Sequence, residues 1–354
     1  MKKQNKSKGS IALTVLFWCL AVVAVICVFV LSVWSYEIKP VTNKENEYSK
    51  KISVSQGATV REVGNVLEEN KLIRSSDVFY IIVRFNLFRE KTDFCLKSGL
   101  YTVSSSMSMH EIYDLLQSGQ QEYLSVVIPE GLTITKIASI LEKNNVCSAS
   151  SFKEMCYDKN ILNKYGIEAS SLEGYLFPDT YFFTPNMDTS RVIDEFVSNF
   201  FRQIESIEGL KNVDFETLNN KIILASIIER EYRVASEAPI IASVFTNRLD
   251  NNIGLYSCAT IEYIITELQG KPHPDRITYD DLKINSPYNT YKWAGLPPGP
   301  ISNPGLVAIN AAVNPAKTNY FYFVLTNPSV GSHTFSESFD QHKAAENIAS
   351  YVNK

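Results

Sequence analysis

The sequence is poor in the residues that hold metal ions. Its 354 residues include only four histidines and six cysteines, and no two cysteines are spaced as CxxC. Zinc sites usually need such ligands at short, regular intervals. We therefore expect no metal site, and the sequence implies no cofactor. Cys147 and Cys156 lie near each other in the chain, and the sequence alone leaves open whether they pair.

An excess of basic charge is also missing. Lysine and arginine total 34 against 38 aspartates and glutamates, a net charge of −4, and four of the lysines lie within the first ten residues. Nucleic-acid-binding proteins usually present a basic face, so we expect no nucleic-acid partner. Apolar residues are plentiful at 45%, which excludes a disordered chain and allows two or three folded units.

One long segment lacks charge altogether. Residues 11–33 contain no charged side chain, enough to cross a ~30 Å hydrocarbon layer at ~1.5 Å per residue. Lysines precede the segment and the first acid after it is Glu37, so the positive-inside tendency places the N-terminus in the cytoplasm. The alternative is a cleaved signal peptide, whose apolar region usually runs ~7–15 residues and ends in small residues. The longer run here, which ends in Val-Trp-Ser-Tyr, favours a retained single-pass anchor in the plasma membrane.

A strand-turn-helix pattern occurs twice after the anchor. ISVSQGATVREVGNVLEEN begins at Ile52, and VVIPEGLTITKIASILEKN follows 74 positions later with Gly131 and Thr133 in the places of Gly57 and Thr59. Each copy is followed by a second helical stretch and then an aromatic extended segment. The first copy resembles the small LysM-like domains that bind aminosugar polymers, and the alternative is a scaffold without a ligand.

The most informative residue further along is Glu229. On a helix it shares a face with Ala225 and Ser226, which are small and leave room for a ligand, and with Arg233. Desolvation raises the pKa of such a carboxyl, as a proton donor near neutral pH requires, whereas a neighbouring arginine lowers it. The alternative is a solvated Glu229–Arg233 pair worth a few tenths of a kcal/mol, which spacing alone favours.

Eight blocks of sequence carry a family resemblance. Six lie in the C-terminal half: ASIIERE at 225–231, SVFTNRL at 243–249, SPYNTY at 286–291, GLPPGPISNPG at 295–305, NPAKTNYFYFV at 314–324 and HTF at 333–335. Two lie upstream: IPEGLT at 128–133 and LEGYLFPDTY at 172–181. In this order the blocks resemble those of the membrane-anchored endolytic murein transglycosylases, the YceG-like or MltG family.

The resemblance implies a lytic transglycosylase whose essential glutamate falls on Glu229. Such enzymes cut the β-1,4 bond between N-acetylmuramic acid and N-acetylglucosamine without water, since the muramyl 6-hydroxyl attacks its own anomeric carbon to form a 1,6-anhydro end. An ordinary glycosidase needs two carboxyl groups. Here one carboxyl suffices, first as the acid and then as the base. The resemblance therefore implies an enzyme that terminates the elongation of nascent glycan strands close to the membrane.

The implied partners are peptidoglycan glycan strands and the cell-wall synthases. Rings and amides that stack on and hydrogen-bond to sugars lie in the proline-rich loop and the family blocks. We expect the substrate-binding residues to be Tyr288, Asn289, Tyr291, Ser226 and Asn247. The alternative for the loop is a rigid segment whose rings cover the core.

The predicted fold class is α+β, in five segments. These are a cytoplasmic tail at 1–10, a transmembrane helix at 11–34, a tether at 35–50, a LysM-like strand-helix module at 51–122 and a mixed α+β catalytic domain at 123–354.

One departure from the family leaves other functions open. The family usually reads Ser-Asp-Pro-Thr where this chain has Ser257-Cys258-Ala259-Thr260, so an acid is missing. A non-catalytic peptidoglycan-binding or cell-wall-synthesis scaffold is therefore an alternative. A muramidase that uses water is another, and it calls for a second carboxylate near Glu229.

Overall fold

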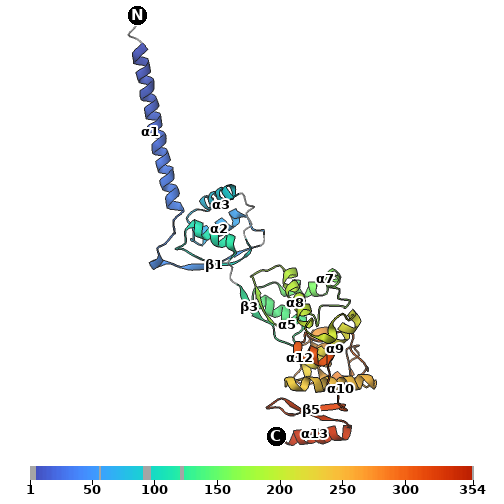
Figure 1. The fold of residues 1–354 in the computed structure, drawn as a ribbon. Coiled ribbons are helices and arrows are strands. Elements are labelled where there is room, and N and C mark those ends of the chain that lie inside the picture. Colours follow the sequence, from blue (N-terminus) through green and yellow to red (C-terminus); the bar gives the residue numbers. More distant parts are fainter. Residues whose placement is uncertain (1–4, 56, 91–96, 120–122, 353–354) are drawn as a thin grey trace. The chain divides into compact units, whose positions relative to one another are not determined.

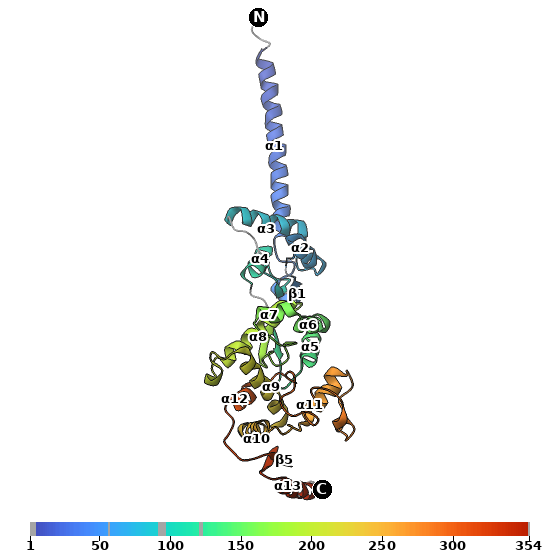
Figure 2. The same ribbon diagram turned by 90° about the vertical axis from the view of Figure 1, so that its right-hand side faces the viewer.

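The computed structural model describes residues 5–55, 57–90, 97–119 and 123–352 (Figures 1 and 2). Within these ranges the chain is a mixed α and β protein with three two-stranded antiparallel sheets and one N-terminal apolar helix. It divides into two compact units, Met1–Tyr123 and Leu124–Lys354. The prediction of a mixed α and β fold behind a single apolar helix is thus confirmed.

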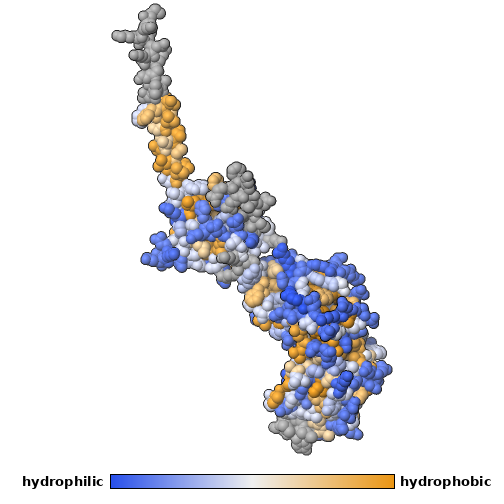
Figure 3. All heavy atoms as spheres, viewed as in Figure 1, coloured by the Kyte–Doolittle hydropathy of each residue, from blue (hydrophilic) through white to orange (hydrophobic). Residues whose placement is uncertain are grey.

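The apolar helix is α1 (Asn5–Glu37), and its surface is hydrophobic over a long stretch (Figure 3). Val15–Glu37 is the one span among the described residues that is long and apolar enough to cross a membrane, and its most apolar window is not buried in the protein. Arg74 then holds the chain that leaves the helix, because its guanidinium donates to the carbonyls of Tyr36, Lys39 and Pro40.

The first unit is built on a strand-helix-helix-strand order. β1 (Ser49–Val54) and β2 (Gly99–Ser104) pair antiparallel, and α2 (Val60–Glu69) and α3 (Ser76–Glu90) connect them. A short 3₁₀ turn precedes β1, and α4 (Met109–Ser118) follows β2. The helices and the sheet enclose a small core of their own.

The second unit begins with the same order. β3 (Leu124–Val127) pairs antiparallel with β4 (Thr180–Phe183), and α5 (Ile134–Lys143), α6 (Ala149–Cys156) and α7 (Lys159–Lys164) lie between them in the chain. The predicted extended segment at 174–183 is therefore a strand only at its end. Its earlier part is a loop whose Gly174 and Leu176 N–H groups donate to the side chain of Asn303.

The two copies share local geometry. Gly57 and Gly131 both have positive φ, 79° and 73°, which glycine adopts at little cost. Thr59 and Thr133 both accept a hydrogen bond from the N–H three residues later and so cap the next helix. The repeat seen in the sequence is thus a repeat of turn and cap geometry.

The remainder of the second unit is mainly helical. It contains α8 (Thr189–Ile204), α9 (Phe215–Glu231), α10 (Ala238–Asp250) and α11 (Cys258–Tyr263), which continues into a π-helical turn at Ile264–Leu268. After a long loop come α12 (Leu306–Val313), the β5 (Tyr322–Asn327)–β6 (Ser332–Ser336) hairpin and α13 (Phe339–Val352). Glu237 occupies the N-cap of α10 and makes no side-chain cap bond, and Pro239 lies in the first turn.

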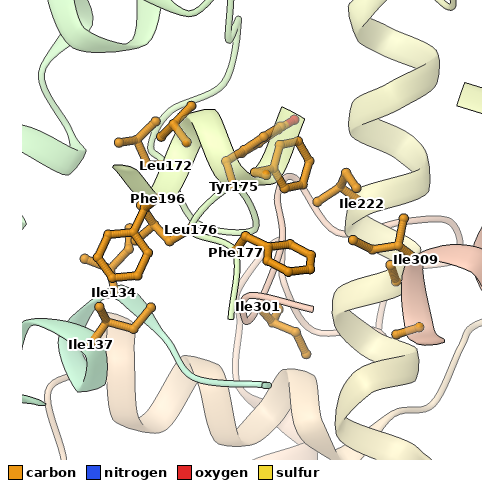
Figure 4. Close-up of a cluster of buried hydrophobic side chains, with 14 of the residues drawn as sticks. Ile134, Ile137, Leu172, Tyr175, Leu176, Phe177, Phe196, Ile222, Ile301 and Ile309 are labelled. Carbon is orange, nitrogen blue, oxygen red and sulfur yellow. The ribbon is translucent and has the colours of Figure 1, made fainter. Parts of the chain in front are cut away.

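Helix α9 lies at the centre of this unit. Seven consecutive residues from Ile222 to Ile228 are buried, and the helix packs against α10, α11 and α12. Figure 4 shows Ile222 and Ile309 of α12 facing each other, beside the aromatic cluster of Tyr175 and Phe177. A helix buried on all sides positions its last turn rigidly, and Glu229 lies in that turn.

Candidate active site

Glu229 lies partly buried at the end of α9. Its Oε2 accepts a hydrogen bond from the Gly305 N–H at 2.9 Å, and the Tyr232 hydroxyl also donates to the carboxyl. Gly305 is the N-cap residue of α12, so the carboxyl is held at the N-terminus of a second helix. The N-cap residue of α12 and the last turn of α9 therefore meet at this side chain.

The electrostatics of Glu229 suit proton transfer. Burial raises the pKa of the carboxyl to about 7, and the Glu130 carboxylate acts in the same direction. The Gly305 N–H, the Tyr232 hydroxyl and Arg230 act against this rise. A carboxyl that keeps its proton near neutral pH is able to act as a general acid. The opposing charge comes from Arg230, and the exposed Arg233 that the spacing had suggested is not among the causes.

The β3–α5 loop forms one wall of the site. A Cβ on Gly131 would lie 3.5 Å from Cγ of Glu229, so the loop touches the carboxyl-bearing side chain. A Cβ on Gly305 would lie 2.2 Å from Oε1 of Glu130, so the Glu130 carboxylate rests against that glycine. Glu130 is exposed. The site thus contains a second carboxylate, and the IPEGLT block was the signal in the sequence that could have identified it.

Arg230 ties this loop to the helical core. Its Nη1 donates to the Gly131 carbonyl at 3.3 Å, and its Nη2 forms an ion pair with Glu262 of α11 at 2.9 Å. The arginine follows Glu229 directly in the chain, so the loop is fixed to the residue next to the candidate acid.

Asn303 joins three loops around the site. Its side-chain oxygen accepts from the Gly174 and Leu176 N–H groups, each at 2.9 Å. Its Nδ2 donates to the Leu132 carbonyl at 2.9 Å and to Oε1 of Glu173 at 2.8 Å. The asparagine is fully buried and lies two residues before the Gly305 donor.

Glu173 belongs to the same network. The carboxyl is buried, accepts from the Ile134 N–H at the start of α5, and has its pKa raised to about 8 by burial. Its contacts are with the start of α5 and with Asn303, so the carboxyl supports the loops behind the site.

Three of the expected substrate-binding residues have their polar side chains engaged with the backbone. Ser226 is fully buried, donates to the Ile223 carbonyl and accepts from the Ile301 N–H at 3.0 Å. Asn289 is also fully buried and donates to two carbonyls of its own loop. Asn247 donates to two carbonyls of the segment before β5, each at 2.9 Å. The structure therefore places these three groups in the support of the loops.

The two expected tyrosines are partly exposed. Tyr288 packs against the ring of Tyr263 with centroids 5.2 Å apart. Tyr291 lies elsewhere, with its hydroxyl 3.1 Å from Sγ of Cys258 and its ring 5.6 Å from that of Tyr256. In the part of the chain that the structure describes, neither tyrosine is a hydrogen-bond partner of Glu229.

The cysteines and acids give no further chemistry at this site. Cys147 and Cys156 are both free thiols. Across the described ranges, no group of three or more His, Cys, Asp or Glu side chains is arranged to hold a metal ion.

The fold and the site together define a class: an apolar N-terminal helix, a duplicated strand-helix module and a core helix that presents one carboxyl with a raised pKa. The model of the YceG-like family matches residues 52–348. The chain belongs to the YceG-like family, as its sequence blocks had indicated.

Named relatives agree with this assignment. The chain is 30% identical over 334 residues to the "Endolytic murein transglycosylase" of Bacillus subtilis (strain 168), covering 90% of this chain and 89% of the relative. It is 28% identical to the protein of the same name in Streptococcus pneumoniae serotype 2, covering 85% of this chain and 58% of that longer protein. These names confirm the prediction of an enzyme of the lytic transglycosylase class.

A solved structure resembles the chain as well. The 2.6 Å crystal structure of a YceG-like protein from Listeria monocytogenes matches with a TM-score of 0.55 and 30% sequence identity. The match covers 84% of this chain and 99% of that one.

Proposed function

We propose that this protein is a membrane-anchored endolytic murein transglycosylase that uses Glu229 as its catalytic acid and base. The observation that carries the proposal is the partly buried Glu229 carboxyl, which has a pKa of about 7 and is hydrogen-bonded to Gly305 beside the Glu130 loop. Family membership and the names of the relatives supply the substrate, the glycan strands of peptidoglycan.

The proposed reaction needs one proton carrier. Protonated Glu229 gives its proton to the oxygen of the β-1,4 bond between N-acetylmuramic acid and N-acetylglucosamine, and that bond breaks. The resulting carboxylate then takes the proton of the muramyl 6-hydroxyl as this oxygen bonds to the anomeric carbon. A 1,6-anhydro end forms, the carboxyl is protonated again, and no water is consumed. The Gly305 N–H stabilises the carboxylate between the two steps.

Glu130 supports a second candidate reaction. Glycosidases that use water need two carboxyl groups. Glu130 is exposed and rests against Gly305, whose N–H donates to Glu229, and in such a reaction its carboxylate would activate a water molecule. This route gives a reducing end in place of an anhydro end, and the product distinguishes the two reactions. A third candidate, glycan binding without cleavage, is favoured by Cys258 in the position of the family's acid.

We propose different roles for the expected substrate-binding residues. Tyr288 and Tyr291 contact the glycan, because their rings are partly exposed. Ser226, Asn289 and Asn247 position the loops that form the groove, because their polar groups already bond to the backbone.

The remaining proposals concern location and assembly. α1 spans the plasma membrane once with its N-terminus in the cytoplasm, and the rest lies outside, where cleavage terminates nascent strands beside the cell-wall synthases. The module at 51–122 is LysM-like and binds glycan, which its β1-α2-α3-β2 order supports. The catalytic domain extends over 123–354.

The test is digestion of purified glycan strands with the full-length protein in detergent, followed by mass analysis of the new ends. We expect anhydro ends from the wild type and none from Glu229→Gln with an unchanged circular dichroism spectrum. Reducing ends would favour the hydrolytic reaction. Uncut glycan with the well-folded wild type would overturn the enzymatic proposal.

A further inference from the structure

A cavity of about 490 Å³ lies at the end of α9 that carries Glu229, between α10, the start of α11, β5 and α13. Its volume is in the range of ordinary ligand pockets. The residues used in the argument below all line the cavity: Glu231, Arg248, Tyr256, Cys258, Tyr322, Phe339 and Glu346.

The cavity is separate from the Glu229 carboxyl. Neither Glu229 nor Gly305 lines it, whereas Glu231 does. Two residues along an α-helix correspond to a rotation of about 200°, so Glu229 and Glu231 project to different sides of α9. Both sites therefore depend on the same helix end without sharing a side chain.

Arg248 forms the floor of the cavity. It is only 7% exposed, and its Nε and Nη1 donate to the Phe321 and Leu255 carbonyls. Its guanidinium lies between the rings of Tyr256 and Tyr322, 5.5 and 5.3 Å from their centroids. Among the described residues Nη2 has no hydrogen-bond acceptor. A fixed, buried donor is thus left for a ligand.

Glu231 lies beside this donor. One of its oxygens accepts from the Ser257 hydroxyl, and the other has no hydrogen-bond partner within the described part of the chain. The carboxyl is partly buried near Arg248, with which it interacts electrostatically. An unused acceptor and an unused donor therefore line one cavity.

A secondary amide has the complementary pair of groups. Its N–H donates to a carboxyl oxygen and its carbonyl accepts from a guanidinium N–H. Exposed rings at the rim, Tyr256 and Phe339, are suited to the apolar face of a sugar. An anion fits less well, because two carboxyl groups, Glu231 and Glu346, line the same cavity as Arg248. The acetamido group of an aminosugar combines the amide with the ring.

We propose that this cavity binds an N-acetylated sugar residue of the glycan strand through its acetamido group. The inference rests on the proposed function for its choice of a glycan ligand. The proposal involves binding and no reaction. The acetamido N–H donates to Glu231, the acetamido carbonyl accepts from Arg248, and the face of the sugar ring packs on Tyr256.

Cys258 provides a local readout, because it is an exposed thiol in the wall of the cavity. The full-length Glu229→Gln variant in detergent is treated with iodoacetamide in the presence and absence of the tetramer of N-acetylglucosamine. The rate of alkylation of Cys258 is measured by peptide mass spectrometry. At ten times the Kd we expect alkylation of Cys258 to slow about tenfold. Alkylation of Cys147, outside the cavity, is the internal control.

A matched probe and two matched variants test the proposal. The unacetylated glucosamine tetramer should not protect Cys258 from alkylation. Protection by the acetylated tetramer should be lost in Tyr256→Ala and kept in Tyr279→Ala, whose ring is 86% exposed and lies elsewhere. Absence of protection, or equal protection by both tetramers, would overturn the inference. Because the Glu229→Gln background does not cleave, failure of the wild type to cut glycan would count against the proposed function alone.

Discussion

The Gly305 N–H donates to Oε2 of Glu229 at 2.9 Å, across 76 positions of sequence. This bond joins the start of α12 to the end of α9, and it is preserved when the carboxyl loses its proton. It stabilises the ionised form, yet burial outweighs it and the pKa of Glu229 remains raised to about 7. The balance leaves the carboxyl able both to give and to take a proton near neutral pH.

Activity should therefore fall as the pH rises above about 7, because the acid step needs protonated Glu229. The contribution of Glu229 to the free energy of unfolding should also fall as the pH rises. A carboxyl whose pKa is raised on folding costs stability once the unfolded chain ionises, above its ordinary 4.5. Glu229→Gln should thus stabilise the fold above pH 7 by up to about 3 kcal/mol, and by little at pH 4. Denaturant unfolding at both pH values checks this, and equal changes at the two would contradict it.

Glu130→Gln should move the alkaline limb of the pH–rate profile to lower pH. The Glu130 carboxylate raises the pKa of Glu229, so its removal lets Glu229 ionise more easily. Rates measured between pH 5 and 9 show the shift, with Glu154→Gln as a control at a carboxyl outside the site. If the variant loses all activity at every pH, Glu130 takes part in the chemistry, as the hydrolytic reaction requires.

Gly131→Ala should reduce cleavage and stability together. The residue has φ of 73°, which costs roughly 1–2 kcal/mol for an L-residue, and the new Cβ would touch Cγ of Glu229. Gly166→Ala is the matched control, since its φ is 66° and no atom lies within 4 Å of the added Cβ. Both should lower the unfolding free energy by a similar amount. Only Gly131→Ala should lower kcat, and equal kcat losses would remove the specific role of this contact.

Asn303→Asp should destabilise the second unit by about 2–4 kcal/mol, because a buried carboxylate is unable to donate to Leu132 and Glu173. The loops on either side of Glu229 should loosen and kcat should fall. Asn310→Ala, at an exposed position of α12, is the control. Chemical denaturation and glycan digestion measure the two effects, and a variant as stable as the wild type would show that the Asn303 hydrogen bonds do not hold these loops together.

Ser226→Ala separates a structural serine from a substrate contact. The hydroxyl is fully buried and accepts from the Ile301 N–H, so its loss should cost about 1–3 kcal/mol of folding free energy. KM for glycan strands should remain unchanged. A raised KM with unaltered stability would show instead that the hydroxyl binds substrate.

Much of the local structure was predictable from the sequence. The turn and the helix cap occur in both copies of the repeat because glycine and threonine specify them locally. The prediction for Glu229 depended on a family block. Its expected partner Arg233 was inferred from helical spacing, but α9 ends at Glu231 and Tyr232 is extended, so Arg233 leaves that face.

The contacts around Glu229 are non-local, so the spacing of residues along the sequence does not predict them. Gly305, Gly131 and Glu130 reach it from loops that are distant in sequence. The same holds for Ser226 and Asn289, whose polar groups suggested sugar binding but face backbone groups of distant or irregular segments.

Arg74 has a mechanical consequence for the anchor. Because it donates to the carbonyls of Tyr36, Lys39 and Pro40, it attaches the chain that leaves α1 to the folded unit. With α1 in a bilayer, this attachment holds the first module close to the membrane surface. The distance between this module and the lipid headgroups then depends on the hydrogen bonds of Arg74 and not on the entropy of a flexible linker.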